Sequence, residues 1–163
     1  MIGKIRTSRA MAASGGHRRK KMDKLMSACG VMCSGCGAYF GASKGPEYQK
    51  QVAEAWHRIY GLNEAAANIS CNGCLGPDED VFHTCKRCTA RRCCRSKGYK
   101  SCAECPITVC EYLERAQSVW DGVPQIGSSL SAADFDRYAR PYCGHRERLA
   151  AARGDTPSSA HRG

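Results

Sequence analysis

The residues with the most distinctive chemistry in this chain are its thirteen cysteines. Eight of them form four C-x-x-C pairs. Two thiolates three positions apart on a tight turn can coordinate the same tetrahedral metal ion. Two such pairs supply the four sulfur ligands of a closed zinc site. The spacing therefore predicts that the chain binds metal through thiolates. The four pairs are Cys33/Cys36, Cys71/Cys74, Cys85/Cys88 and Cys102/Cys105.

A disulfide framework is the alternative interpretation, because short cysteine-rich chains are often secreted and cross-linked. Three observations favour metal. The number of cysteines is odd, the N-terminal region lacks the apolar core of a signal peptide, and repeated C-x-x-C spacing is typical of metal sites. We therefore expect reduced thiols in a cytoplasmic protein.

Eleven cysteines are predicted ligands, and they allow one to three metal ions in sets of about four thiolates. One arrangement joins the second and third C-x-x-C pairs, and another joins the last pair with Cys93 and Cys110. Cys29 and the first pair would then need a fourth ligand from elsewhere. Cross-braced pairings fit the spacing equally well, and the roles of Cys94 and Cys143 stay open. The predicted ligands are Cys29, Cys33, Cys36, Cys71, Cys74, Cys85, Cys88, Cys93, Cys102, Cys105 and Cys110.

Structural zinc is the primary expectation for the metal, with an iron–sulfur cluster as the alternative, since thiolates alone also hold clusters. A closed four-thiolate zinc site leaves no position for a substrate, which favours a binding module over an enzyme. The C-x3-C-x2-C triplet beginning at Cys29 is similar to that of radical S-adenosylmethionine enzymes. No series of strand–helix units follows it, however, and Gly35 stands where that family usually has an aromatic residue. A thiol-redox enzyme is disfavoured too, because no thioredoxin-like strand–helix unit surrounds a C-x-x-C pair.

The elements that must position these turns are mostly short helices. Residues 46–60 have apolar side chains at every third or fourth position, with Pro46 at the first helical position and Gly61 at the end. Further helices are predicted over residues 88–97 and 106–120, and a short one between Ser131 and Pro141. Only three Phe and two Trp are available for a conventional core, and a metal often compensates for limited burial. The predicted fold class is a small metal-stabilised domain, α-rich and irregular, with C-x-x-C knuckles and short helices.

The composition divides the chain into three parts. Residues 1–21 are basic and free of acids, so we expect a disordered arm there; the alternative is a natural start at Met22, with this segment upstream of it. Residues 22–143 are predicted to form the cysteine-rich metal-binding domain. Residues 144–163 are small, polar and charged, and are predicted to be a disordered tail.

The net charge of +10 is concentrated at the N-terminus, where residues 1–28 carry +7, whereas residues 29–143 carry +1. Within that region, Lys86–Lys100 contains seven cations and no acid. This stretch either binds phosphate groups or neutralises nearby thiolates. A protein is the primary expected partner, with nucleic acid as an alternative through Lys86–Lys100 or the basic arm. No apolar run approaches the ~20 residues that span a bilayer, so no membrane partner is expected.

Residues 26–115 resemble the bacterial and archaeal family catalogued as domain of unknown function 3795. The resemblance begins with a C-G-x-x-C-x-x-C-x-A-Y phrase at Cys29, a tryptophan-bearing helix and a C-x-G-C phrase at Cys71. It continues with C-x-x-R-x-C from Cys88, a Lys-Gly, a C-A-x-C phrase and a further cysteine before Glu111. The resemblance implies a metal-binding domain of uncharacterised activity. Family members commonly begin near the position of Met22.

Overall fold

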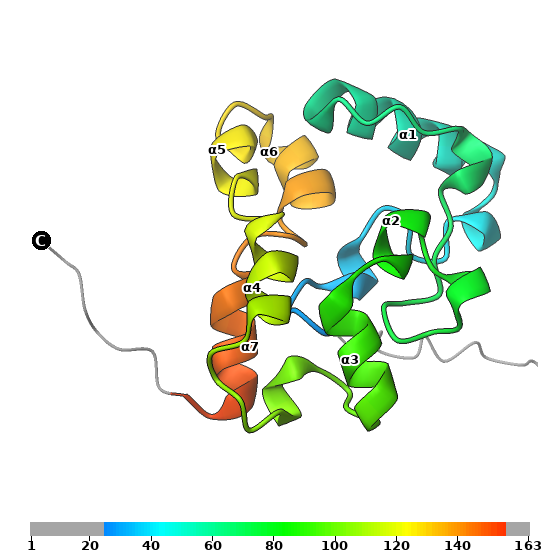
Figure 1. Ribbon diagram of the computed structural model, residues 1–163. Helices are drawn as coiled ribbons and strands as arrows, with labels where there is room; N and C mark the ends of the chain where they lie inside the picture. Colours follow the sequence, from blue (N-terminus) through cyan, green and yellow to red (C-terminus); the bar gives the residue numbers. More distant parts are fainter. Residues whose placement is uncertain (1–24, 156–163) are drawn as a thin grey trace, which may run out of the picture.

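The computed structural model describes residues 25–155, so the predicted basic arm lies outside the described residues. Within that range the chain forms seven α-helices joined by 3-10 turns and irregular loops, with two isolated β-bridges and no strand. Helix α1 lies at one end of the molecule, and α3 and α7 lie at the other (Figure 1). The helices are α1 Pro46–Tyr60, α2 His83–Lys86, α3 Thr89–Lys97, α4 Glu111–Ser118, α5 Val123–Gly127, α6 Ala132–Asp134 and α7 His145–Arg153.

Helix α1 has the bounds predicted for it. Pro46 occupies the first turn, and Gly61 ends the helix in the left-handed conformation, with its amide donating to the His57 carbonyl at 2.9 Å. Proline suits the first turn because its missing N–H would have no intrahelical partner, and glycine adopts a positive φ without a Cβ clash. The predicted apolar face is buried, with Val52 and Trp56 at its centre.

Helix α3 and the turn at Ser131 also follow their local signals. Cys88 caps α3, and Gly98 closes it with φ of 71°. The Ser131 side chain accepts a hydrogen bond from the Asp134 amide at 3.2 Å, as expected of an N-cap. The chain continues from α6 into a single π-helical turn, Phe135–Ala139, before Pro141.

The helix predicted from Pro106 begins later than expected, at Glu111. A 3-10 turn over residues 102–104 comes before this region. Cys110, directly before the helix, has extended backbone with φ of −141°. Three consecutive β-branched residues, Ile107, Thr108 and Val109, separate Pro106 from α4. Their restricted χ1 rotamers disfavour helix, which explains why the proline does not open one here.

The prediction of a disordered tail from Gly144 is wrong for its first part, because residues 145–153 form α7. His145 and Leu149 on this helix are 4% and 2% exposed. Helix α7 packs on the loop that carries Cys29: the His145 carbonyl approaches Gly30 so closely that a Cβ there would lie 2.0 Å from it. The composition of the segment gave no sign of this packing, which comes from a contact between residues far apart in the chain.

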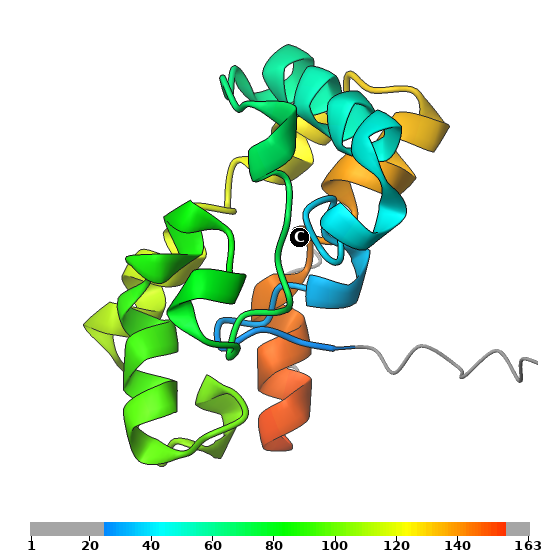
Figure 2. The same ribbon diagram turned by 90° about the vertical axis from the view of Figure 1, so that its right-hand side faces the viewer.

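Two small clusters of buried side chains form the interior. Around α1, Val52 and Trp56 pack with Ile69, Phe82 and Tyr138. The second cluster lies between α3, α4 and α7 and includes Ala90, Leu113, Leu149 and Tyr142, together with several cysteines. The N-terminal segment passes between α3 and α7 (Figure 2). The expectation of a small, helix-rich, irregular fold is confirmed.

None of the helices in residues 25–155 is both long and apolar enough to span a membrane.

Gly30→Ala should destabilise the fold far more than Gly61→Ala. Both glycines have positive φ, but nothing lies within 4 Å of a Cβ at Gly61, whereas a Cβ at Gly30 would strike the His145 carbonyl. Gly61→Ala should cost about 1 kcal/mol from backbone strain alone. Gly30→Ala should cost about 3 kcal/mol or more, since overpacking adds to the strain. Urea unfolding under reducing conditions measures both, and equal losses would contradict the close packing of α7.

Candidate metal centre

All thirteen cysteines lie within the described residues, carry free thiols and are sheltered from solvent. Five are buried and the other eight are half-buried. Most lie on irregular backbone rather than within helices, in the segments 29–36, 71–74, 85–88 and 102–110. The buried cysteines are Cys29, Cys33, Cys71, Cys94 and Cys102.

Seven thiols gather where the first three C-x-x-C motifs meet, and we call them the central thiol cluster. An isolated parallel β-bridge between Tyr39 and Cys71 joins the first motif to the second, and the Phe40 amide donates to the Cys71 carbonyl at 2.8 Å. The thiols are close enough that negative charge on one raises the pKa of others: Cys74 acts on Cys33, and Cys36 acts on Cys85. The cluster consists of Cys29, Cys33, Cys36, Cys71, Cys74, Cys85 and Cys88.

Backbone amides donate to several of these sulfurs. The Gly73 amide lies 3.4 Å from Cys71 Sγ, and the Val31 and Ala38 amides donate to Cys29 and Cys36. In each case the donor is two residues after the cysteine. Gly30 and Gly73 have φ of 100° and 103°, a conformation that other residues rarely adopt. These turns direct N–H dipoles at sulfur, which stabilises thiolates and orients them as ligands.

Burial raises the pKa of five thiols in the central cluster, those of Cys29, Cys33, Cys36, Cys74 and Cys85. It is the largest cause for each of them, and the pKa of Cys74 and of Cys85 rises to about 12. Repulsion from neighbouring thiolates adds to the effect. Without a cation these five thiols therefore remain protonated at neutral pH. A metal ion supplies the positive charge that makes several adjacent thiolates stable, and it displaces their protons on binding.

Arg91 is a fully buried cation beside the central thiol cluster. Its Nε donates to the Cys74 carbonyl, and its Nη2 donates to the Gly76 carbonyl at 2.7 Å and lies 2.8 Å from Asp78 Oδ1. Its Nη1 is buried with no hydrogen-bond partner. Burial is the main cause that raises the Cys74 pKa, and the Arg91 charge opposes it. Because it is buried and paired with Asp78, Arg91 is not available to bind a phosphate group.

The remaining cysteines of α3 and the 102–110 segment line a separate small cavity with a volume of about 20 Å³, and we call them the cavity thiols. Cys94 Sγ lies 3.5 Å from Cys102 Sγ. Arg153, at the end of α7, also lines this cavity and donates to the Cys102 carbonyl at 2.9 Å. The cavity thiols are Cys93, Cys94, Cys102, Cys105 and Cys110.

Cysteine sulfur is a suitable ligand for a thiophilic metal, but the sulfurs are not arranged as a closed shell around one ion. Thiolates on one tetrahedral zinc ion lie about 3.8 Å apart, as Zn–S bonds of about 2.3 Å require. No group of three or more His, Cys, Asp or Glu side chains among residues 25–155 is arranged to hold one ion. The first C-x-x-C motif lies beside the second through the Tyr39–Cys71 bridge, and negative charge on Cys36 acts on Cys85 of the third. The last motif shares its cavity with Cys93, Cys94 and Cys110.

The segment after residue 115 also contributes to the centre, which no spacing pattern indicated. The Tyr142 hydroxyl donates to Cys36 Sγ at 3.3 Å, and the Tyr142 ring stacks on Trp120 and contacts the Tyr60 ring edge-to-face. Arg148 Nε donates to the Gly30 carbonyl at 2.9 Å. A lone tyrosine after a proline carries no sequence signal for such a contact, because the contact joins residues 106 positions apart.

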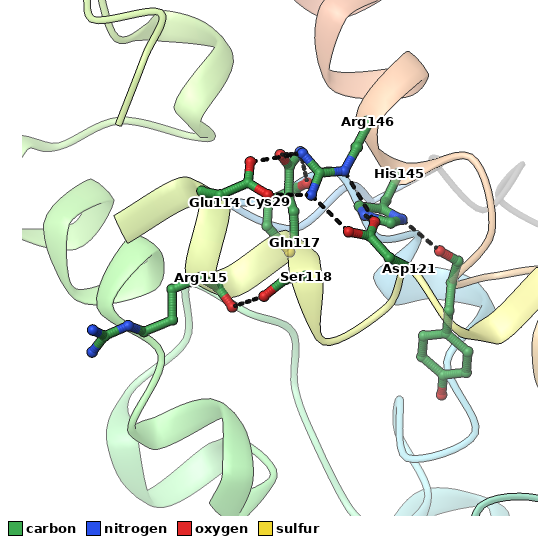
Figure 3. A network of polar contacts seen from close by, with 9 residues as sticks. Cys29, Glu114, Arg115, Gln117, Ser118, Asp121, His145 and Arg146 are labelled. Carbon is green, nitrogen blue, oxygen red and sulfur yellow. Dashed lines mark hydrogen bonds and ion pairs between the residues drawn. The ribbon is translucent and has the colours of Figure 1, made fainter. Parts of the chain in front are cut away.

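A network of polar contacts joins α4, α7 and the loop of Cys29 (Figure 3). Arg146 bridges Glu114 and Asp121, with contacts of 2.7 Å and 2.8 Å from Nη2 to Oε1 and Oδ2. Gln117, on the same face of α4, accepts from Arg146 Nη1 at 3.2 Å and donates to the Cys29 carbonyl at 3.1 Å. Hydrogen bonds from Arg146 lower the pKa of both carboxyl groups, and those groups raise the pKa of the guanidinium. The network holds Cys29 in place from outside the cysteine motifs.

Together these features describe a small helical protein that shelters two sets of thiols. Residues 25–115 match the family described as "Protein of unknown function (DUF3795)". The match covers more than half of the chain, so this protein belongs to that family, as its motifs predicted. No curated protein and no solved structure matches the chain.

Arg146→Gln should lower the free energy of unfolding at neutral pH. In the variant, this free energy should also depend less on pH in the acidic range. In the folded protein the pKa values of Glu114 and Asp121 are below their ordinary values because of Arg146. The two carboxylates therefore contribute their full stabilisation above a pH of about 4, the pKa of such groups in the unfolded chain. This stabilisation is lost as the pH falls through their lower pKa values in the folded protein. The stability difference between wild type and variant should be largest near pH 7 and should shrink steadily below about pH 4.

The measurement is thermal unfolding between neutral and acidic pH, with Arg140→Gln as the control. Arg140 also pairs with a carboxylate, Asp136, but that pair lies four residues apart on the surface and joins no separate elements. The control should change stability little. A constant difference between wild type and Arg146→Gln across the whole pH range would contradict the role of this network.

Proposed function

We propose that this protein binds metal ions through its cysteine thiolates and that the ions fix its irregular loops into a module for binding a partner. The observation that carries the proposal is the arrangement of the thiols. Twelve of the thirteen free cysteines lie in two sheltered sets, and backbone amides in the tight turns donate to the sulfurs of Cys29, Cys36 and Cys71. Protonated thiols gain little from such donors because their sulfur is a weak acceptor, whereas metal-bound thiolates are stabilised by them.

Zinc in a structural role is the first candidate for the metal. The ligand type is entirely sulfur, which zinc accepts in closed four-coordinate sites. The two clusters of buried side chains contain few large apolar residues, so they stabilise a chain of this size only weakly. Metal bonds between loops would supply the missing stability, since the free energy of metal binding becomes free energy of folding.

An iron–sulfur cluster in the central thiol cluster is the second candidate. No three potential ligands within the described part of the chain are arranged for a single ion, although several of the seven thiols act on the pKa of others. In a 4Fe–4S cluster each thiolate binds a different iron atom, so such a cluster does not require three sulfurs around one ion. A cluster held by these thiols would have a redox function.

A protein is the partner that the surface favours. Val109 is 91% exposed, and Ile107 and Tyr112 are about half exposed on the same segment. Exposed apolar residues gathered beside a structured site are typical of protein-binding surfaces. Nucleic acid binding through Lys86, Arg87 and Arg92, all of which are exposed, is the alternative.

Anaerobically purified protein should contain bound metal, and removing that metal should unfold it. With structural zinc, we expect a colourless sample with about one to three zinc ions per chain, as its thiol number allows. A strong chelator in reducing buffer should abolish cooperative thermal unfolding, because the loops lose their cross-links. Elemental analysis, visible absorption and circular dichroism measure these properties. Visible absorption with bound iron would support the cluster instead, whereas a metal-free protein that unfolds cooperatively would refute metal binding.

Tyr142→Phe should weaken metal retention, whereas Tyr60→Phe should not. Both hydroxyls donate a hydrogen bond, from Tyr142 to Cys36 Sγ and from Tyr60 to the Tyr138 carbonyl at 2.6 Å. Loss of an outer-shell donor typically costs about 10- to 100-fold in metal affinity. Competition with a chromophoric chelator gives the affinities. If the two variants lose affinity equally, the effect is a general loss of packing and not loss of the bond to sulfur.

A further inference from the structure

The cavity thiols include one pair that already stands close to ligand spacing. Cys94 Sγ and Cys102 Sγ are 3.5 Å apart, near the ~3.8 Å between two thiolates on one tetrahedral zinc ion. Cys94 is 1% exposed and Cys102 is 8% exposed. The two residues come from different elements, α3 and the 3-10 turn at Cys102–Glu104. One bound ion would therefore cross-link these elements.

We propose that Cys94, rather than its neighbour Cys93, binds one metal ion together with Cys102, and that Cys105 and Cys110 complete the site. This inference rests on the proposed metal-binding function and assigns a role to a cysteine that spacing left open. Cys105 and Cys110 line the same cavity and lie on irregular backbone. They are two further sulfurs that border the space beside the Cys94–Cys102 pair, which itself needs little movement to reach ligand spacing.

The cavity has room for a single ion. Its volume is about 20 Å³, and one water-sized body requires roughly 10–15 Å³. A divalent ion such as zinc fits this space.

Arg153 provides the charge that such a site requires. Four thiolates around a divalent ion leave two net negative charges, which are costly to bury without a cation. Arg153 is the charged residue among those that line the cavity, and its Nε is buried with no hydrogen-bond partner. Its guanidinium is held at Cys102 by the bond to the Cys102 carbonyl. An unpartnered cationic donor in a thiol-lined cavity favours an anionic metal–thiolate centre.

The helical geometry of α3 distinguishes the two adjacent cysteines. Successive residues on an α-helix point about 100° apart. Cys94 lies on the buried face with Ala90, which is 1% exposed, whereas Cys93 is half-buried at its edge. Cys93 therefore borders the cavity, and Cys94 faces Cys102.

Cobalt titration of matched variants tests the assignment. In reducing, anaerobic buffer, Cys94→Ser should bind one Co²⁺ fewer per chain than wild type, or bind it more than about 100-fold more weakly, since losing a ligand exceeds the loss of an outer-shell partner. The thiolate-to-cobalt absorption should fall accordingly. Cys93→Ser should keep the wild-type stoichiometry and spectrum. Loss of the ion in Cys93→Ser with retention in Cys94→Ser would overturn the proposal.

Cadmium NMR of the wild-type protein gives an answer that does not depend on how the variants fold. After loading with ¹¹³Cd²⁺, one cadmium resonance should correlate with the β-protons of Cys94 and Cys102. Correlation with the β-protons of Cys93 in place of Cys94 would refute the proposal while leaving metal binding intact. If wild-type protein binds neither Co²⁺ nor Cd²⁺, the proposed function fails together with this site.

Discussion

The structure depends on the burial of thiol groups on irregular backbone. Between the helices, the segments that carry most of the cysteines have neither strand ladders nor long helices to satisfy their polar groups. Their order comes from turns whose amides donate to sulfur and from a few long side chains that reach their carbonyls. A thiol is a weak hydrogen-bonding partner, whereas a thiolate bound to a metal is a strong acceptor. The proposed metal would therefore stabilise these loops, because it would convert weakly accepting thiols into thiolates whose charge it compensates.

Three arginines contact the backbone carbonyls of cysteine-bearing loops and bring positive charge near the sulfurs. Arg91 binds the carbonyl of Cys74, Arg148 that of Gly30, and Arg153 that of Cys102. A buried guanidinium requires a negative partner, or its desolvation cost is not recovered. This distribution accounts for the basic composition around the cysteines without a polyanionic ligand. The exposed cations of α2 and α3 are not needed for this role.

The segment beyond the family match is part of the same fold. Within residues 116–155, the Tyr142 hydroxyl donates to Cys36 Sγ and the Gln117 side chain donates to the Cys29 carbonyl. Helix α7 packs closely against Gly30. The match itself ends at residue 115. In this protein, the first cysteine motif is thus enclosed by elements that follow the shared region, and substitutions there affect the candidate centre directly.

Local chemistry allowed several features to be read from the sequence alone. The ends of α1 follow from Pro46 and Gly61, the end of α3 follows from Gly98, and the Ser131 cap follows from its side chain, because each signal acts within one helical turn. The motifs around Cys29, Cys71 and Cys88 identified the family. Tertiary structure decided the rest. The sequence did not place Tyr142 at Cys36, Arg153 at Cys102 or α7 on Gly30, because these contacts join distant residues. The late start of α4 at Glu111 is different, because the β-branched residues after Pro106 are a local signal that the sequence already contained. Composition also did not predict that the segment after Gly144 would be ordered. A short helix with few apolar residues is stable only where another surface is present to bury them.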